Sequence, residues 1–351
     1  MSGLIEVVDG GVSVTVQDGG RHGYRSIGVP LSGALDPLRL AAANALLGNA
    51  PGAAALEVPL GGPTLKAISG TVRVALGGAV EGKLVGGKGS VRKVPAWHTA
   101  TLFPGDTIQI GGVAEGVAYV AVSGGVDVPE HLGSRSTYQR AALGGIRGRA
   151  LARGDHLPCA RLGCDPWLEY RAAEAPAGSD GPIRVILGPQ EEHFTAEALA
   201  NFLGQPYRVS RDMDRMGMRL EGVALAHSAL GAEIVSDGVT PGAIQVPANG
   251  QPIVLLADCQ TSGGYPKIAT VIRADLGRLG HLRPGAELRF ASVTHAEAVR
   301  ALQAEAEALA RWVGGIESFR PPGVIDEEAL YGGNLISGVL RGDEPFAPHL
   351  S

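Results

Sequence analysis

The chain has 351 residues, of which 45% are hydrophobic, 19% are charged and 5% are aromatic, and its formal net charge at pH 7 is −5. This length is enough for two ordinary hydrophobic cores, and the apolar fraction excludes intrinsic disorder. No stretch approaches 18 consecutive apolar residues, and the charge balance provides no basic surface. We therefore expect neither a membrane span nor a nucleic-acid partner.

Cysteine usage and the N-terminal segment indicate the compartment. The segment MSGLIEVVDGG has neither a basic start nor an apolar core, so we expect no secretion. Cys159, Cys164 and Cys259 are too few for a disulfide framework, which predicts reduced thiols and a cytoplasmic location. His156 precedes the first two cysteines, but a structural zinc site needs four ligands, so we expect no metal.

Glycine and proline are the most informative residues of the composition. The 53 glycines and 23 prolines are dispersed and separate short apolar runs. Frequent turns between short strands are typical of a β-barrel or a β-sandwich. In chain order, the sequence predicts strands at Gly11–Val16, Leu56–Val58, Val72–Ala75, Ala100–Leu102, Thr107–Ile110, Ala118–Ser123, Arg184–Leu187, Met218–Glu221, Ile253–Leu256 and Glu287–Phe290.

Helices are few, and each predicted helix begins after a residue whose side-chain oxygen can cap its first turn. These capping residues are Asp36, Thr195 and Thr294. Proline at the first helical position supports the first helix, and a Thr-x-x-Glu capping box supports the third. The predicted helices span Leu38–Leu47, the segment from 196 to Leu203, and a long Ala/Glu/Leu-rich segment that ends near Val313.

A polar segment divides the chain. Residues Glu169–Gly181 read EYRAAEAPAGSDG, which predicts a linker. We therefore expect a first domain at 1–170, a second at 182–292, and a C-terminal helix with a Pro/Gly-rich tail at 293–351. The turn sequence FPGDTIQI before the linker resembles RPGAELRF after it, with ARGDHL as a looser copy. Two interpretations remain open: related barrels, or a turn that recurs in any β protein.

Three clusters of polar residues lie among glycines. The first runs from TVQDGGRHGY to GVPLSGALD, the second is GSRSTY, and the third comprises SRDMDRMG, GAIQVP and QTSGGYPK. Glycines let the backbone approach a ligand, and Gln, Asp, Arg and Lys provide directed hydrogen bonds and charge. Any one cluster is better explained by loops and surface ion pairs than by a binding site. Three clusters in one chain favour a site for a polar small molecule.

Common catalytic signatures are missing or incomplete. The sequence has no GxSxG, no HExxH and no Met-Lys-Met for biotin attachment. Two stretches approach a P-loop around Lys83 and Lys88, but each lacks the Ser or Thr that binds magnesium. Cys259 has no His–Asp partner at a recognisable spacing, which weakens its case as a nucleophile. A self-sufficient amidase, esterase, metalloprotease or biotin carrier is therefore not expected.

The clusters resemble the C-subunit family of 5-oxoprolinases, also called allophanate hydrolase subunit 2, KipI antagonist or biotin-dependent carboxyltransferase domain. The stretches that carry the resemblance are TVQDGGRHGY, GVPLSGALD, AANALLGN, ALEVPLGGP, GSRSTY, SRDMDRMGMRLEG, GAIQVPANGQPIVLLADCQTSGGYPKIATVI and LRPGAELRF, in order across about residues 5–290. The resemblance implies a mainly β fold, with two cyclophilin-like β-barrel domains, a few short helices and a C-terminal helix. It also implies hydrolysis of 5-oxo-L-proline to L-glutamate with ATP, together with an A subunit and a KipI-like B subunit.

Lactam chemistry suggests roles for the cluster residues. A five-membered lactam is a poor electrophile, so its carbonyl oxygen needs activation, and cations and amides stabilise the resulting charge. We predict Lys267, Arg215, Asp214 and Asp18 as catalytic residues. Lys267 is the only lysine beyond residue 93, and its alternative is a solvated surface turn. The predicted substrate-binding residues are Gln17, Arg21, Tyr24, Ser32, Asp36, Arg135, Tyr138, Gln245, Gln260, Gly263, Gly264 and Tyr265.

Two other functions stay open. The resemblance also covers the carboxyltransferase part of urea carboxylase, in which case a biotin carried by another chain would be the cofactor. A third possibility is a regulator without catalysis that binds a partner similar to KipI or to the B subunit. A neighbouring gene for the A subunit would favour the oxoprolinase, and a gene for a biotin carboxylase would favour the carboxyltransferase.

Overall fold

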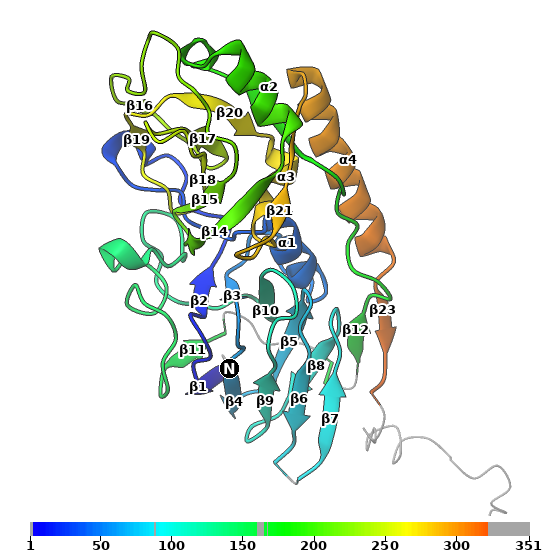
Figure 1. Cartoon of the computed structure of the whole chain (residues 1–351). Coiled ribbons are helices and arrows are strands. Elements are labelled where there is room, and N and C mark those ends of the chain that lie inside the picture. Colours follow the sequence, from blue (N-terminus) through cyan, green and yellow to red (C-terminus); the bar gives the residue numbers. More distant parts are fainter. Residues whose placement is uncertain (1–2, 88, 160–164, 167, 322–351) are drawn as a thin grey trace, which may run out of the picture.

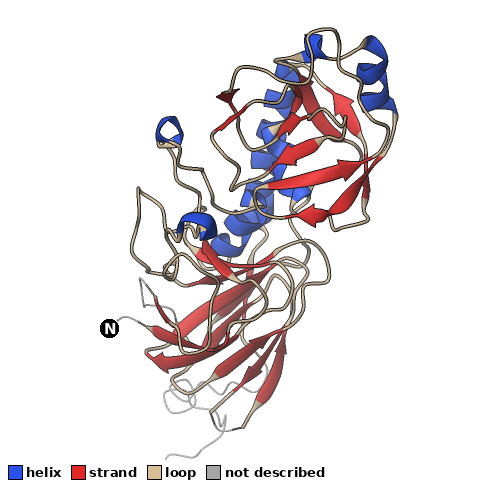
Figure 2. Cartoon of the chain, turned by 60° about the vertical axis from the view of Figure 1, so that its left-hand side comes forward, coloured by secondary structure: helices blue, strands red, loops and turns tan. Residues whose placement is uncertain are grey.

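The computed structural model describes residues 3–321, apart from 88, 160–164 and 167. Its strands form two groups at opposite ends of an elongated molecule, and the longest helix, α4 (His295–Gly314), runs beside both (Figures 1 and 2). The mainly β fold class is therefore confirmed. Cys164 and the predicted tail beyond residue 321 lie outside the described residues.

The first group consists of two facing sheets with antiparallel pairing throughout. The apolar side chains of both inner faces form one continuous core. Strand alternation explains this, since every second residue points inward. One sheet has the order β11 (His156–Pro158), β1 (Leu4–Asp9), β4 (Thr64–Ser69), β9 (Thr107–Ile110), β6 (Gly82–Val85) and β7 (Val91–Val94). The other sheet has the order β2 (Thr15–Gln17), β3 (Ala55–Val58), β10 (Ala118–Val122), β5 (Val72–Gly77) and β8 (Thr99–Leu102).

The second group is a single sheet of eight strands. Its two outer strands, β21 (Glu287–Leu288) and β22 (Phe290–Ser292), are separated in the chain only by Arg289, so the sheet is a nearly closed barrel. A second apolar core fills it. Between the outer strands the order is β14 (Tyr207–Met213), β15 (Gly217–Glu221), β18 (Ile253–Leu255), β17 (Ala243–Gln245), β20 (Lys267–Val271) and β13 (Ile183–Leu187).

All three predicted helices are confirmed, together with their caps. The side chain of Asp36 accepts from Arg39 N at the start of α1 (Pro37–Ala45), and Thr195 caps α2 (Ala196–Gly204). Thr294 and Glu297 form the predicted capping box of α4. Helix α3 (Arg273–Leu279) was not predicted, because no side chain caps it. Three short 3₁₀ helices complete the set: η1 (Arg25–Ile27), η2 (Gln139–Ala141) and η3 (Glu191–His193).

Helices α1 and α4 cover the outer face of the five-stranded sheet. Leu40 of α1 is buried in a cluster that includes Trp97 and Tyr119, and Trp312 of α4 packs edge-on to Trp97 with ring centroids 5.5 Å apart. The narrow apolar stripe of α4 therefore packs on the strands from outside, as expected from its sequence.

The linker prediction is wrong for its first residues. Strand β12 (Glu169–Arg171) pairs with β23 (Glu317–Phe319) beyond α4. Glu169 is buried, accepts a hydrogen bond of 2.7 Å from Thr101 N and forms an ion pair with Arg92. Its charge suggested exposure, but its Oε1 is paired inside the protein by these two groups. Residues 172–181 contain no strand or helix.

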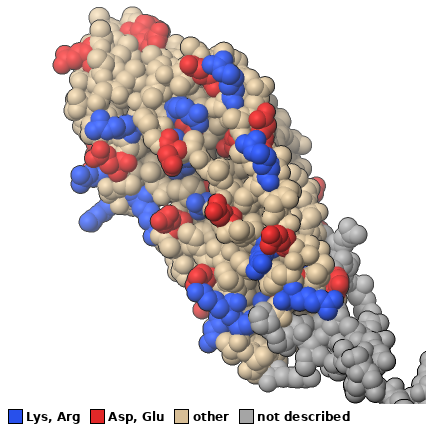
Figure 3. All heavy atoms as spheres, turned by 90° about the vertical axis from the view of Figure 1, so that its right-hand side faces the viewer, with Lys and Arg blue, Asp and Glu red and all other residues tan. Residues whose placement is uncertain are grey.

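The face that carries α4 shows basic and acidic side chains interspersed (Figure 3). None of the described helices is both long and apolar enough to cross a membrane.

Candidate functional site

The first two polar clusters are held together by Asp18. Its carboxylate accepts hydrogen bonds from Gly20 N at 2.8 Å, Ser134 Oγ at 2.7 Å and Arg135 N at 2.6 Å, and also from Ser136 Oγ. A carboxylate with four donors is strongly held in place. Asp18 thus joins two loops that are more than 100 residues apart in the chain.

Gln17 and Arg21 are buried in the same loops. Gln17 Nε2 donates to Thr15 Oγ1 at 3.0 Å and to Thr137 O at 3.1 Å. Arg21 donates from Nε and Nη2 to backbone carbonyls of the second cluster, and burial lowers its pKa. Neither side chain lines the cavity described below, so the structure places both in the framework of the loops.

Arg215 links the two groups of strands. It donates to Asp258 Oδ2 at 2.9 Å and to Gly33 O at 2.5 Å, and it forms an ion pair with Glu57. Glu57 in turn accepts from Tyr119 Oη at 2.8 Å. Burial lowers the pKa of Arg215, but the two carboxylates outweigh it and raise the pKa above the ordinary value. The charge of Arg215 is therefore neutralised inside the protein.

The third cluster borders a cavity of about 580 Å³ over the barrel strands. Four predicted site residues line it: Asp214, Gln245, Gln260 and Tyr265. We call this cavity the arginine pocket, because three arginines lie on its wall. Its lining consists of Arg140, Arg211, Asp212, Met213, Asp214, Met216, Gly217, Arg219, Gln245, Ile253, Leu255, Gln260 and Tyr265.

Two glutamine amides meet in the arginine pocket. Gln245 is only 2% exposed, and its Oε1 accepts from Gln260 Nε2 at 3.3 Å. Gln245 Nε2 is buried and has no hydrogen-bond partner among the described residues. An unsatisfied buried donor costs free energy, which a bound acceptor recovers. Gln17 Oε1 and Arg21 Nη1 are also buried and unsatisfied, but unlike them Gln245 lines this cavity, so its amide indicates a ligand here.

Gly263 makes room for the Gln245 amide. A Cβ atom at this position would lie far inside van der Waals contact with Gln245 Nε2. Gly263 belongs to β19 (Ser262–Gly263), which pairs with β16 (Asp237–Gly238). A Cβ at the neighbouring Gly264 would meet its nearest atom at 3.5 Å, an ordinary contact. An alanine at position 263 would thus displace the Gln245 carboxamide, whereas one at position 264 would not.

The arginines give the pocket a positive wall. Arg211 and Arg219 are exposed and form no ion pair with any residue that the structure describes. Arg140 forms an exposed ion pair of 3.3 Å with Asp214, whose Oδ1 accepts from two backbone amides of the following turn. Unpaired guanidinium groups bind carboxylates and phosphates in a bidentate manner. The arrangement suits an anion that also carries an acceptor for Gln245.

Lys267 lies beside this pocket but does not line it. The side chain is buried, and its Nζ donates to Asp237 Oδ2 at 2.7 Å and to Gly238 O at 3.2 Å. The hydrogen bond from Lys267 lowers the pKa of Asp237. The lysine is thus buried and paired with an exposed carboxylate rather than solvated on a surface turn, and it holds β16 next to Gly263. Its catalytic role stays a prediction.

The remaining predicted residues are scattered. Tyr24 precedes η1, whose Arg25 donates to Gln260 O at 3.1 Å and so connects the first cluster to the third. Arg135 pairs with Asp127 and Glu130 on the surface. Tyr138 makes a backbone bridge with Leu143. Ser32 and Asp36 line a different cavity between the two strand groups.

Sequence reasoning missed three arginines of the pocket. Arg219 is exposed between buried Met218 and Leu220, an alternation that places it on the outer face of β15. Arg211 lies inside the third cluster, but its local sequence does not distinguish it from the other arginines there. Arg140 lies in η2, and only its contact with Asp214 brings it to the pocket.

Thiol and metal chemistry find no support in the described residues. Cys159 and Cys259 are buried, and burial raises the pKa of Cys159 to about 12 and that of Cys259 above its ordinary value. A nucleophilic thiol needs the opposite shift. Between residues 3 and 321, leaving aside the undescribed positions, no three His, Cys, Asp or Glu side chains gather in a way that suits a metal ion.

The sequence and the fold both have known relatives. The family described as carboxyltransferase domain, subdomain A and B, matches residues 27–292. The chain is 36% identical over 301 residues to the C subunit of 5-oxoprolinase from Escherichia coli (strain K12), covering 86% of this chain and 94% of the relative. It is also 36% identical over 298 residues to the protein of the same name from Haemophilus influenzae, covering 85% and 94%.

A solved structure shares the fold. The crystal structure of the Kluyveromyces lactis urea carboxylase matches with a TM-score of 0.79 and 28% identity, and the match covers 88% of this chain and 29% of that one. Together with the match to the family and the two bacterial relatives, this likeness extends over most of the described residues. The chain therefore belongs to the carboxyltransferase domain family, subdomains A and B, and to the C-subunit family of 5-oxoprolinases.

Proposed function

We propose that this protein is the C subunit of an ATP-dependent 5-oxoprolinase, which hydrolyses 5-oxo-L-proline to L-glutamate together with its A and B subunits. The observation that carries the proposal is the 36% identity over 94% of the length of two relatives that bear this name. The arginine pocket supports it, because its groups match the two polar ends of the substrate.

The polar groups of the arginine pocket match those of the substrate. 5-Oxo-L-proline has one carboxylate and a lactam with one acceptor and one donor. Arg211 and Arg219 provide unpaired cations for the carboxylate. Gln245 Nε2 lacks an acceptor, and the lactam oxygen would serve as one. The neighbouring Gln260 carboxamide would accept a hydrogen bond from the lactam N–H. The pocket thus orients the substrate by pairing its carboxylate with arginines and by forming hydrogen bonds with its lactam.

Activation of the lactam requires ATP because its carbonyl carbon is a poor electrophile. ATP supplies the activation when the three subunits act together. Groups that stabilise the negative charge developing on the carbonyl oxygen lower the barrier. In this chain that group is the Gln245 amide, while Lys267 and Arg25 fix the segments that carry Gly263 and Gln260.

Partner dependence follows from the contents of the pocket. Its lining residues include no Ser, Thr, Cys or His, and its two carboxylates are exposed on the rim. We therefore expect the isolated chain to be nearly inactive. The KipI-like B subunit is expected to bind it stably and to bury a large, mostly apolar surface.

The test is to co-express the chain with the A and B subunits from the same genome and to measure glutamate release from 5-oxo-L-proline. Activity is expected only with all three chains and ATP. Omission of each chain in turn provides the controls. ATP-dependent turnover by the purified single chain would contradict the partner dependence, and inactivity of the full set would contradict the proposed reaction.

The likeness to urea carboxylase favours one alternative, a carboxyltransferase component that uses biotin bound to another chain. The same complex is then assayed with urea and bicarbonate in the presence of its biotin-bearing neighbours. Inhibition by avidin would identify the carboxyltransferase, and activity unaffected by avidin would favour the oxoprolinase. A stable complex with the B subunit and no turnover in either assay would indicate a regulator.

A further inference from the structure

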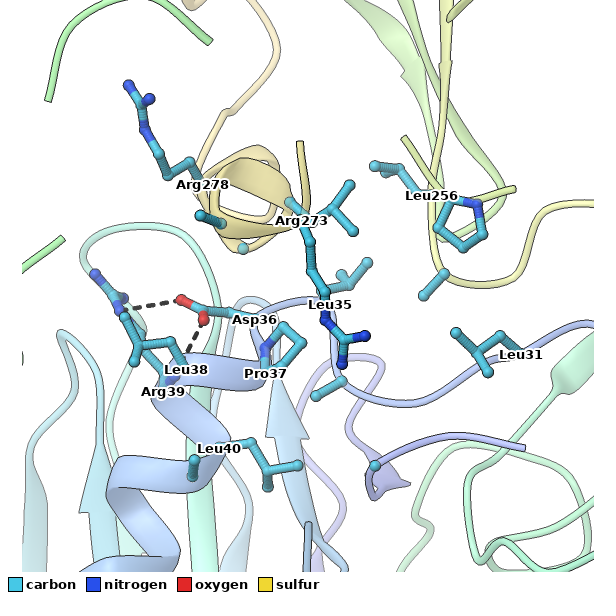
Figure 4. A pocket seen from close by; sticks show the side chains of 18 of the residues that line it. Leu31, Leu35, Asp36, Pro37, Leu38, Arg39, Leu40, Leu256, Arg273 and Arg278 are labelled. Atoms are coloured by element: carbon cyan, nitrogen blue, oxygen red, sulfur yellow. Dashed lines mark hydrogen bonds and ion pairs between the residues drawn. The ribbon is translucent and has the colours of Figure 1, made fainter. Parts of the chain in front are cut away.

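A second cavity of about 600 Å³ lies between the two strand groups. One wall comes from the loop that enters α1 and from α1 itself, and the other from β18, β20 and α3 (Figure 4). It shares a single lining residue, Leu255, with the arginine pocket. It is therefore a separate site, and its occupant would contact both strand groups.

Most of its wall is apolar. Figure 4 shows leucines on both sides of the opening, from the α1 side and from the barrel side. These and neighbouring apolar residues are Leu31, Leu35, Pro37, Leu38, Leu256 and Leu276. Cavities of this size and composition are typical of small-molecule sites, in which a few polar groups fix the orientation of the ligand.

Most charged groups on the wall already have partners. Asp36 accepts from Arg39 N at 3.0 Å and from His281 Nε2 at 2.6 Å. Arg278 pairs with Asp275 and also donates to two backbone carbonyls. These groups are therefore not available to a ligand without loss of an existing contact.

Arg273 and Ser32 are different. Arg273 is exposed and makes no hydrogen bond or ion pair with any described residue. Figure 4 shows its side chain extending from α3 toward Leu35 and Pro37, whereas Arg278 points away from them. Ser32 is only 3% exposed, yet its Oγ has no hydrogen-bond partner among the described residues. A free cation and an unsatisfied buried hydroxyl thus belong to one mainly apolar cavity.

We propose that this cavity binds a small monocarboxylate with an apolar body. Arg273 would pair with the carboxylate, Ser32 Oγ would donate to it, and the leucines would cover the apolar body. The carboxylates of Asp18, Asp36 and Glu305 of α4 also lie on the wall. Because these carboxylates repel additional negative charge, a single-charged ligand fits better than a polyphosphate.

Octanoate is the probe, and it is titrated into the purified full chain by isothermal titration calorimetry, with uncharged octanamide as its matched analogue. Octanoate is expected to bind at least about tenfold more tightly than octanamide, since only the acid pairs with Arg273. Arg273→Gln is expected to lower octanoate affinity about tenfold and to leave octanamide unchanged, and Ser32→Ala to weaken octanoate severalfold. Arg208→Gln, an exposed arginine outside both cavities, serves as the control.

The proposal would be overturned by no octanoate binding, by equal affinity for octanoate and octanamide, or by equal effects of Arg273→Gln and Arg208→Gln. Loss of binding in Arg219→Gln, with Arg273→Gln unaffected, would also overturn it, because octanoate would then occupy the arginine pocket. The measurement uses the chain without its A and B partners. Its result is therefore independent of whether the oxoprolinase proposal holds.

Discussion

At the scale of single residues, the environment of each polar side chain separates ligand-facing groups from structural ones. Gln245 and Gln260 meet in a cavity, and one of their amide groups is unsatisfied. Asp18 and Arg215 belong to the same kind of glycine-rich sequence, yet every oxygen of Asp18 is used and Arg215 is bound by two carboxylates. The structure therefore favours the glutamines and the unpaired arginines, rather than Asp18 and Arg215, as the residues that bind a ligand.

The first prediction concerns the two adjacent glycines of β19 and its turn. In the complete complex, Gly263→Ala is expected to lower kcat/KM at least about tenfold, because its methyl group displaces the Gln245 amide. Gly264→Ala has space for its methyl group and is expected to stay within about twofold of the wild type. Steady-state glutamate release measures both. Equal kinetics for the two variants would remove Gln245 from the site.

The second prediction concerns the unpaired cations of the arginine pocket. Arg219→Gln is expected to raise KM for 5-oxo-L-proline roughly tenfold or more, since a hydrogen bond to a charged group contributes about 1.5–3 kcal/mol. Thermal stability should not change, because Arg219 makes no ion pair with the described residues. Arg208→Gln on neighbouring β14 is the matched control. An unchanged KM in Arg219→Gln would place the substrate carboxylate elsewhere.

At the scale of elements, the recurring turn sequence has one structure. In FPGD, ARGD and RPGA the glycines Gly105, Gly154 and Gly285 all have φ between 87° and 96°. Each turn is closed by a hydrogen bond in which the backbone N–H of the residue after the glycine donates to the carbonyl oxygen of the residue two positions before the glycine. The turn occurs twice in the first strand group and once in the second. Its recurrence therefore does not by itself show that the two groups are related.

The third prediction concerns alanine substitutions at the glycines of these turns, which have no close neighbours. No atom would lie within 4 Å of a Cβ at Gly105 or Gly285, so alanine there costs only the left-handed backbone conformation. Each substitution is expected to lower the free energy of unfolding by about 1–2 kcal/mol. Gly178→Ala, also without close neighbours but without a positive φ, should be neutral. Urea unfolding measures all three, and equal stabilities would contradict the conformational explanation.

At the scale of the whole molecule, side chains from distant segments determine how the two strand groups sit together. Arg215 of the second group binds Glu57 and Gly33 of the first. Helix α4 then brings Glu305 near Asp36 at the start of α1 and Asp275 of α3. Burial, followed by these two carboxylates, raises the pKa of Glu305 to about 7, although Arg184 and Arg273 act in the opposite direction.

The fourth prediction follows from that shift. Because the pKa of Glu305 is higher in the folded state than its ordinary value of 4.5, the folded protein binds more protons between about pH 4.5 and pH 7. The ionised carboxylate destabilises the fold above about pH 7, and this penalty fades as the pH falls. Glu305→Gln should therefore raise Tm at about pH 8 and have little effect near pH 5.

Thermal melting across this pH range provides the measurement. Glu307→Gln is the control, since Glu307 is exposed on the same helix and forms only a surface ion pair with Arg311. A Tm gain for Glu305→Gln that is the same at every pH would show that the carboxylate does not titrate in this range.

Features that depend on residues close together in the chain could be predicted without the structure. Asp36, Thr195 and Thr294 cap the helices that follow them, because the capping oxygen and the amides it accepts from lie within one turn. The glycine turns and most strands were predicted for the same reason. Helix α3 was missed because it lacks such a cap, and the similar family motifs identified the family without showing their geometry.

Which polar residues line a cavity depends on contacts between distant parts of the chain. The carboxylates that neutralise Arg215 belong to Glu57 and Asp258, which lie 158 and 43 positions away in the chain, and Lys267 pairs with Asp237, 30 positions away. A charged residue among glycines has the same local sequence whether its partner is a carboxylate of the protein or a bound anion. Folding brings carboxylates of the protein to Arg215, whereas Arg219 stays without an ion pair among the described residues. The binding site therefore depends on long-range contacts.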